Sequence, residues 1–173
     1  KNATIAIAKH HGPVYLRFGR PKVPNFTKDE PFTIGKAIQL QEGKDVSIFA
    51  TGHTVWEALK ASEKLKEHNI NCEIINITTI KPLDKVSILN SIQKTNCAIT
   101  CEEHQRLGGL GGSISQLCAN HYPIPLEFVA INDQFGESGK PMDLMEKYQI
   151  DQNSIFNAVR KVIKKKSNHL KNE

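Results

Sequence analysis

The sequence predicts an α/β protein: three layers, with a doubly wound, mostly parallel sheet covered by helices on both faces. Short, mostly apolar runs alternate along the chain with longer segments in which apolar residues recur at helical spacing. Apolar strands that alternate with amphipathic helices are typical of a parallel sheet buried on both faces. Right-handed crossovers between such strands produce an open, doubly wound sheet.

The regular part begins at Asp45 and contains four predicted strands. These are Val46–Thr51, Cys72–Ile77, Ala98–Cys101 and Leu126–Ile131. A helix should follow each of the first three strands, and two more helices should follow the fourth, the first of them at Met142–Tyr148. The last helix should bury residues spaced three to four apart, which are Ile155, Val159 and Val162.

Helix starts are predicted from capping residues. Thr54 and Glu57 have the spacing of a capping box. Asp84 should cap the helix Val86–Lys94, and Asp151 should cap the final helix. The buried face of the second helix is predicted to comprise Val86, Leu89 and Ile92.

The first 44 residues lack this regular pattern. Residues 2–11 favour the end of a helix stopped by Gly12 and Pro13, and Val14–Phe18 favours a short strand. Residues 19–44 contain three prolines and little periodicity, which is typical of an extended linker. Because the chain opens at Lys1, inside a helical pattern, we expect residues 1–18 to be the end of a preceding domain in a larger protein.

The charge distribution argues against a nucleic-acid partner. The net charge of +5 resides entirely between Arg160 and Glu173, and the preceding 159 residues carry no net charge. Nucleic-acid binders usually spread basic residues over a folded face, whereas a short basic block is typical of a solvated tail. Residues 167–173 are therefore predicted to be a basic tail. The sequence also contains no apolar run long enough to span a membrane.

The four cysteines lie singly among apolar neighbours and form no CxxC pair. This pattern argues against a zinc site and against thioredoxin-like chemistry. It favours reduced thiols in the core of a cytoplasmic protein. The four are Cys72, Cys97, Cys101 and Cys118.

Three ionisable residues, Glu102, Glu103 and His104, follow the third predicted strand. Open α/β sheets bind ligands at the carboxyl ends of their strands, so the triplet is a candidate acid/base or anion site. The competing interpretation, which we favour, is an ion-paired loop tip or a subunit interface.

A glycine-rich segment, Gly108–Gly112, follows the triplet. It does not match the dinucleotide fingerprint, because Ile114 stands where the third glycine is needed, and it lacks the Gly-Lys-Ser/Thr of a phosphate loop. Gly109 and Gly111 could expose backbone N–H groups to an anion at a helix start. Glycine at such a position more often permits close packing, and we favour that interpretation.

Several segments, in this order, resemble the C-terminal part of transketolase. They are GPVYLRFGRP, DVSIFATGHTVWEALKASEKL, TIKPLD, EEHQRLGGLGG and NDQFGESGKP. TIKPLD occurs in variant form across related thiamine-diphosphate enzymes. The FGESG loop and the GRP ending favour transketolase over deoxyxylulose-phosphate synthase or a 2-oxoacid dehydrogenase β-subunit.

The resemblance implies an enzyme that moves a two-carbon ketol unit between sugar phosphates in the pentose phosphate pathway. It implies thiamine diphosphate and Mg²⁺ as cofactors of the complete enzyme, which would act as a homodimer. Residues 1–18 would end the pyrimidine-binding domain, and residues 45–166 would form the C-terminal domain, with a five-stranded sheet that includes one antiparallel strand. The partner would be the rest of the transketolase chain or an N-terminal subunit.

The resemblance assigns one functional residue to this chain. Arg20, in FGRP, matches the family arginine that binds the substrate phosphate, and arginine at a strand end suits bidentate phosphate contact. The family's metal motif and catalytic residues lie upstream of Lys1. We therefore expect no catalytic residue, metal or bound cofactor in this chain. The alternative function is a module that binds a partner or an anionic effector at Glu102–Gly112.

Overall fold

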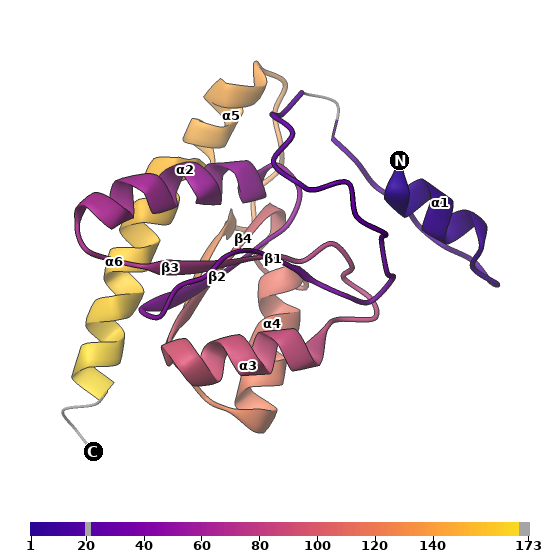
Figure 1. Cartoon of the computed structure of the whole chain (residues 1–173). Helices are drawn as coiled ribbons and strands as arrows, with labels where there is room; N and C mark the ends of the chain where they lie inside the picture. Colours follow the sequence, from indigo (N-terminus) through magenta and orange to yellow (C-terminus); the bar gives the residue numbers. More distant parts are fainter. Residues whose placement is uncertain (20–21, 170–173) are drawn as a thin grey trace.

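The computed structural model describes residues 1–19 and 22–169. Within them, a five-stranded sheet has the order β1-β3-β2-β4-β5 (Figure 1). Strands β2 to β5 are parallel, and β1 is antiparallel to β3. The strands are β1 (Ile38–Gln41), β2 (Val46–Ala50), β3 (Cys72–Asn76), β4 (Ala98–Gln105) and β5 (Leu126–Ile131). The predicted fold class is confirmed.

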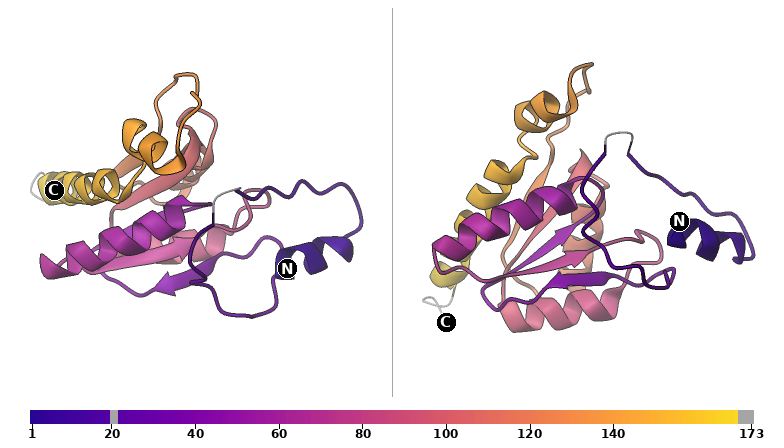
Figure 2. Two further views of the ribbon diagram at one scale, coloured as in Figure 1. Left: turned by 90° about the horizontal axis from the view of Figure 1, so that it is seen from above. Right: turned by 45° about the horizontal axis from the view of Figure 1, so that its top comes forward.

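Helices cover both faces of the sheet (Figures 1 and 2). Helices α2 (Thr54–Glu67) and α6 (Gln152–His169) cover one face, and α3 (Lys85–Thr95) and α4 (Leu110–His121) cover the other. Alternate residues of β2 point into separate cores: Ile48 packs with α2 and α6, whereas Phe49 packs with α3 and α4. Both side chains are fully buried, which explains why this strand is apolar at successive positions.

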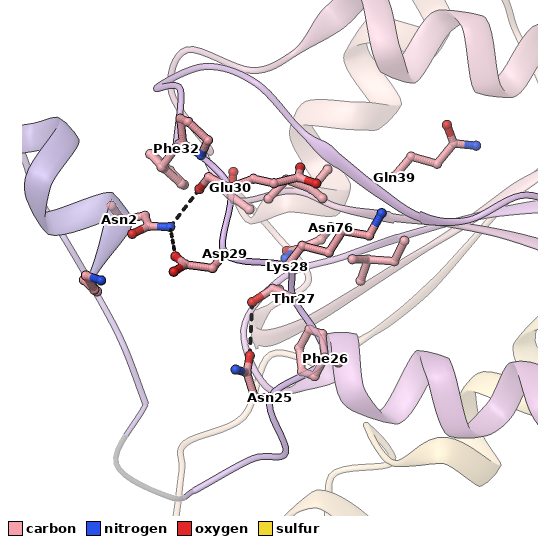
Figure 3. A pocket seen from close by; sticks show the side chains of 16 residues that line it. Asn2, Asn25, Phe26, Thr27, Lys28, Asp29, Glu30, Phe32, Gln39 and Asn76 are labelled. Atoms are coloured by element: carbon pink, nitrogen blue, oxygen red, sulfur yellow. Dashed lines mark hydrogen bonds between the residues drawn. The ribbon is translucent and has the colours of Figure 1, made fainter.

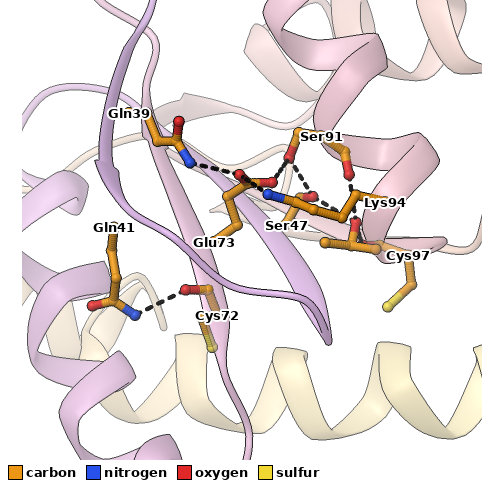
Figure 4. Close-up of polar contacts among 9 residues, drawn as sticks. Gln39, Gln41, Ser47, Cys72, Glu73, Ser91, Lys94 and Cys97 are labelled. Carbon is orange, nitrogen blue, oxygen red and sulfur yellow. Dashed lines mark hydrogen bonds and ion pairs between the residues drawn. The ribbon is translucent and has the colours of Figure 1, made fainter.

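Strand β1 lies within the segment that the sequence analysis assigned to a linker. Residues 38–41 instead pair with β3 in the register Ile38↔Asn76, which supplies the antiparallel strand that the resemblance implied. Side chains reinforce the pairing (Figure 4). Gln39 Nε2 donates to Glu73 Oε1 over 2.8 Å, and Gln41 Nε2 donates to the Cys72 carbonyl over 2.8 Å.

The carboxylate of Glu73 joins this edge strand to α3 (Figure 4). It is buried on β3 and accepts hydrogen bonds from Ser91 Oγ and Lys94 Nζ, each over 2.5 Å, besides the one from Gln39. Ser91 in turn lies 2.6 Å from the hydroxyl of Ser47 on β2. A buried carboxylate with this many donors stabilises the layer that it connects.

Two of the three predicted caps are confirmed. The Asp84 carboxylate accepts the Ser87 N–H over 3.2 Å, and the Asp151 carboxylate accepts the Ser154 N–H over 3.0 Å. The predicted capping box is wrong, because Thr54 lies inside α2 and its hydroxyl is 2.9 Å from the Cys101 carbonyl. Glu57 instead accepts the backbone N–H of Gln152 at the start of α6, over 2.9 Å.

The buried face of α3 also differs from the prediction. Val86 is 63% exposed, whereas Ile88 and Ile92 are fully buried. The helix begins one residue earlier than predicted, at Lys85, and its inner face is set by Ile88, Ser91, Ile92 and Thr95. Two of these residues are polar and belong to the hydroxyl network around Ser47, which hydrophobic periodicity does not reveal.

The N-terminal segment lies apart from the core (Figure 2). The predicted helix is confirmed as α1 (Asn2–Ala8), but none of its residues is buried. Val14–Phe18 forms no strand, and Tyr15 and Phe18 are 88% and 83% exposed. A strand needs a neighbouring strand to satisfy its backbone hydrogen bonds, and the described residues offer none at this segment.

The Asn2 side chain of helix α1 hydrogen-bonds residues 29 and 30 (Figure 3). Asn2 Nδ2 donates to Asp29 Oδ1 over 2.9 Å and to the Glu30 carbonyl over 2.7 Å. A cavity of about 760 Å³ lies between α1, residues 25–32 and β1. These hydrogen bonds join exposed groups, so they stabilise the position of the helix weakly.

All four cysteines are buried and free, as predicted for core thiols. No helix in the described part of the chain is both long and apolar enough to cross a membrane.

Candidate functional site

The carboxyl ends of β2 and β4 form the point where the chain changes direction in the sheet. From β2 the chain crosses to β3 on one side, and then returns past β2 to β4 on the other. Open α/β sheets bind ligands in the crevice at such a switch point. Gly52 and His53 follow β2 here, and the predicted triplet lies at the end of β4. The triplet belongs to the strand itself, which is longer than predicted.

Glu102 is directed at the start of α4. It is 1% exposed, and its two carboxylate oxygens accept the backbone N–H groups of Leu110 and Gly111, each over 2.8 Å. The first N–H groups of a helix have no partner within the helix and carry positive potential, so a carboxylate there is stabilising. The carboxylate therefore lies where an external anion would bind at this helix start.

The glycines of this loop are needed for close approach. A Cβ on Gly111 would lie 2.6 Å from Phe128 Cδ1 and 2.8 Å from Thr100 Oγ1, and a Cβ on Gly109 would overlap the Glu102 carboxylate. Neither glycine has a positive φ, so the requirement is steric rather than conformational. This geometry supports the packing interpretation of Gly109 and Gly111.

Glu103 points to the opposite side and holds His53. Its Oε1 lies 3.0 Å from His53 Nδ1, and its Oε2 accepts the His53 backbone N–H over 3.0 Å. Gly52 has a φ of +65°, and a Cβ there would lie 2.7 Å from Glu103 Oε2. Glycine is thus needed at this turn both for its conformation and for the approach of the carboxylate.

His104 and His53 both contact the segment that precedes Arg20. Arg17 Nη1 hydrogen-bonds His104 Nε2. Gly19 lies so close to the His53 ring that a Cβ on Gly19 would overlap it. Arg20, the predicted ligand of the substrate phosphate, lies outside the described residues. The structure thus brings Glu103, His104 and the Arg17–Gly19 segment together, and it directs Glu102 elsewhere.

A cavity of about 490 Å³ lies beside the His53–Glu103 pair. One wall is the segment Lys22–Pro24, and another is the start of α2, where Trp56 stacks on Phe26 with ring centroids 6.0 Å apart. The far wall is α5 (Pro141–Lys147), which contributes Met142 and Met145. The cavity is thus mainly apolar, with the His53–Glu103 pair at its edge.

His53 was not among the predicted site residues. It follows β2, the triplet lies in the last part of β4, and both strands end at the same sheet edge. That shared edge is the signal that could have identified it.

No group of three or more histidine, cysteine, aspartate or glutamate side chains in the described part of the chain could hold a metal ion. The residues at this site therefore do not fit the Mg²⁺ that the resemblance implies for the complete enzyme. We assign no chemical step of this chain to Mg²⁺ or thiamine diphosphate.

Residues 35–155 match the family model described as the transketolase C-terminal domain. The chain belongs to this family. The match begins before β1 and ends within α6, so it includes the antiparallel strand and the whole switch point.

Named relatives agree with this assignment. This chain is 40% identical over 162 residues to the 6-deoxy-6-sulfo-D-fructose transketolase subunit of Clostridium sp. strain MSTE9, covering 93% of this chain and 50% of that protein. It is 35% identical to human transketolase, covering 95% of this chain and 27% of that protein. A solved structure described as a split gene transketolase, inactive beta4 tetramer, superposes with a TM-score of 0.91 at 36% identity, covering 94% of this chain and 54% of that one. The chain thus spans about half the length of the Clostridium subunit and of the split gene transketolase chain, and about a quarter of human transketolase.

Proposed function

We propose that this chain acts as the C-terminal part of a transketolase. That enzyme would transfer a two-carbon ketol unit between sugar phosphates, with thiamine diphosphate and Mg²⁺ held by the rest of the enzyme. The family match and the likeness to named transketolase subunits support the proposal. In this proposal the chain contributes packing surface and the phosphate-binding Arg20, and the catalytic residues lie elsewhere in the enzyme.

One structural observation carries the proposal that a further domain is required. Tyr15 and Phe18 are almost fully exposed, and α1 has no buried residue. Exposed aromatic side chains in an extended segment are typical of an interaction surface. We propose that residues 1–18 complete a pyrimidine-binding domain, supplied by the same polypeptide or by an N-terminal subunit, and that the assembly is a homodimer.

The test is ketol transfer by the complete enzyme. This chain together with its N-terminal counterpart should convert phosphorylated sugars in the presence of thiamine diphosphate and Mg²⁺, and this chain alone should not. Absence of ketol transfer by the complete enzyme would contradict the proposal. A requirement for a lipoyl carrier would instead indicate a 2-oxoacid dehydrogenase β-subunit.

The assembly can be tested separately with Phe18→Glu. A charge at this exposed site should leave the fold of the chain intact but weaken its association with the N-terminal part, because charges are depleted from buried interface cores. Val86→Glu on α3 is the matched control, since Val86 is exposed on the folded domain. Equal association of both variants would argue against the role given to residues 1–18.

The role of Arg20 has its own test. Arg20→Ala should weaken the binding of phosphorylated substrates by about 1.5–3 kcal/mol, the value of a charge-assisted hydrogen bond. The binding of unphosphorylated sugars should be unchanged. The effector-binding alternative at Glu102–Gly112 is less favoured, because the Glu102 carboxylate already accepts the N–H groups of Leu110 and Gly111.

A further inference from the structure

We propose that exposed apolar side chains at the carboxyl ends of β4 and β5 form the surface on which the N-terminal counterpart of this chain docks, with Phe135 as the anchor. Leu107 and Phe135, together with Tyr15 and Phe18, make up this carboxyl-edge surface. The inference rests on the proposed function, which supplies the counterpart as the part of the enzyme that residues 1–18 would complete. It gives a role to the loops after β4 and β5.

Phe135 is the most exposed of the large apolar side chains that the structure describes, at 98%. It lies in the loop between β5 and α5, and Leu107, in the loop between β4 and α4, is 73% exposed. Single exposed apolar residues are ordinary on a protein surface, whereas several that gather at one place mark an interaction site.

The backbone around Phe135 is attached to the body of the protein. Gln105 Nε2 donates a hydrogen bond to the Gln134 carbonyl over 2.8 Å. The hydroxyl of Tyr148, a buried residue, donates to the Phe135 carbonyl over 3.2 Å. Two successive carbonyls of the loop are thus fixed, and the ring beyond them remains in solvent. A rigidly presented aromatic side chain loses little conformational freedom on binding, so it suits the role of an interface anchor.

Consecutive residues at the end of β4 attach both parts of the carboxyl-edge surface to the sheet. Gln105 holds the loop of Phe135, and His104 hydrogen-bonds Arg17 in the N-terminal segment. Leu107 follows two residues later. The exposed aromatic residues on either side of Arg17 therefore lie at the same sheet edge as the two loops, and the four apolar side chains surround the end of β4.

The occupant follows from the N-terminal segment. This chain spans 50% of the Clostridium subunit, so that relative has about as many residues again. Under the proposed function, residues 1–18 end a domain of the counterpart, and the contact of Arg17 with His104 brings that domain to this edge. Aromatic and aliphatic side chains are also what the buried core of a stable interface contains. A second copy of this chain is the alternative occupant.

The experiment measures binding of the counterpart, expressed as a separate polypeptide, to variants of this chain. Phe135→Glu should raise Kd at least about thirtyfold, the effect of losing an interface anchor, and Leu107→Glu should raise it about tenfold. Ala119→Glu is the control and should change Kd less than about twofold. Ala119 is also exposed and apolar, but it lies near the end of α4, which leads to the opposite edge of the sheet.

Hydroxyl-radical labelling of the wild-type protein gives a second measurement that needs no variant. Phe135 should be labelled readily in this chain alone and protected in the complete enzyme. His121, exposed at the end of α4, should be labelled equally in both.

Equal Kd values for Phe135→Glu and Ala119→Glu, or equal labelling of Phe135 in both samples, would overturn the inference, while ketol transfer by the complete enzyme would still support the proposed function. A wild-type chain that sediments as a dimer by itself, and as a monomer after Phe135→Glu, would assign the surface to a second copy and also overturn the inference. Absence of ketol transfer, with binding of the counterpart that still depends on Phe135, would refute the proposed function and leave the docking surface in place.

Discussion

Glu102 on β4 and Gly111 on α4 are joined by a 2.8 Å hydrogen bond from the Gly111 N–H to a carboxylate that is 1% exposed. The second oxygen of the same carboxylate accepts the N–H of Leu110 over 2.8 Å. A strand residue therefore provides the cap of the helix that follows it. This contact closes the β4–α4 loop and fixes the start of α4 against the sheet.

Glu102→Gln is expected to lower the free energy of unfolding by about 2 kcal/mol. The amide retains one oxygen as an acceptor, but its NH₂ group then faces a backbone N–H, and a buried donor left without a partner costs about 1–3 kcal/mol. Urea unfolding would measure the difference. Glu63→Gln, on the exposed surface of α2, is the control and should change stability by less than about 0.5 kcal/mol. Equal stability of the two variants would contradict the capping role.

Gly111→Ala should lower the stability of the protein, whereas Gly112→Ala should not. Both residues lie in the first turn of α4, where alanine is ordinarily the better helix former by about 1 kcal/mol. A Cβ at position 111 would lie 2.6 Å from Phe128, so overpacking should lower the free energy of unfolding by about 1–3 kcal/mol. A Cβ at position 112 meets no atom within 4 Å, so Gly112→Ala should be neutral or stabilising. Thermal unfolding of the two variants tests whether the requirement for glycine at position 111 is steric.

The parallel core was predictable from sequence because its signals are local. The strands β2, β3 and β5 are mostly apolar at successive positions, and Asp84 and Asp151 cap their helices through their own neighbours in sequence. Strand β1 could not be predicted from hydrophobic periodicity. Its pairing depends on the side chains of Gln39 and Gln41 reaching β3, and it lies in a segment whose prolines are typical of a linker.

The candidate site was predicted only in part. The triplet was found because it follows an apolar strand, but its three side chains point to three different partners. Glu103 meets His53 from another strand end, and His104 meets Arg17, 87 residues earlier in the chain. Such pairs depend on strand order, which periodicity does not provide. The packing interpretation of Gly109 and Gly111 depends in the same way on Glu102 and Phe128 lying opposite them.

The four thiols are expected to be unreactive in the native protein. Burial raises the pKa of Cys72 to about 12 and the pKa values of Cys97 and Cys118 to about 11, and it also raises the pKa of Cys101. At neutral pH very little thiolate is present, and thiolate is the reactive form. A colourimetric disulfide reagent should therefore detect no thiol in the native chain and all four in denaturant. A fast-reacting native thiol would show that one of the core elements opens readily.

Asp84 should make the protein sensitive to acid. Burial alone would raise the pKa of its carboxyl, but hydrogen bonds from the Ala37 N–H and from the Ser87 N–H and hydroxyl, together with Lys36, outweigh burial and lower this pKa below 3.8. Because the folded-state pKa is depressed, the stabilisation is complete above the unfolded-state pKa and disappears as pH falls through the folded-state pKa. An asparagine at position 84 is an uncharged and weaker acceptor that does not titrate. The Asp84→Asn variant should therefore be less stable than the wild-type protein by about 1–2 kcal/mol at neutral pH. The difference from wild type should shrink below about pH 4. Unfolding free energies measured across this range, with the exposed Asp143→Asn as control, test the prediction, and a difference that does not change with pH would refute it.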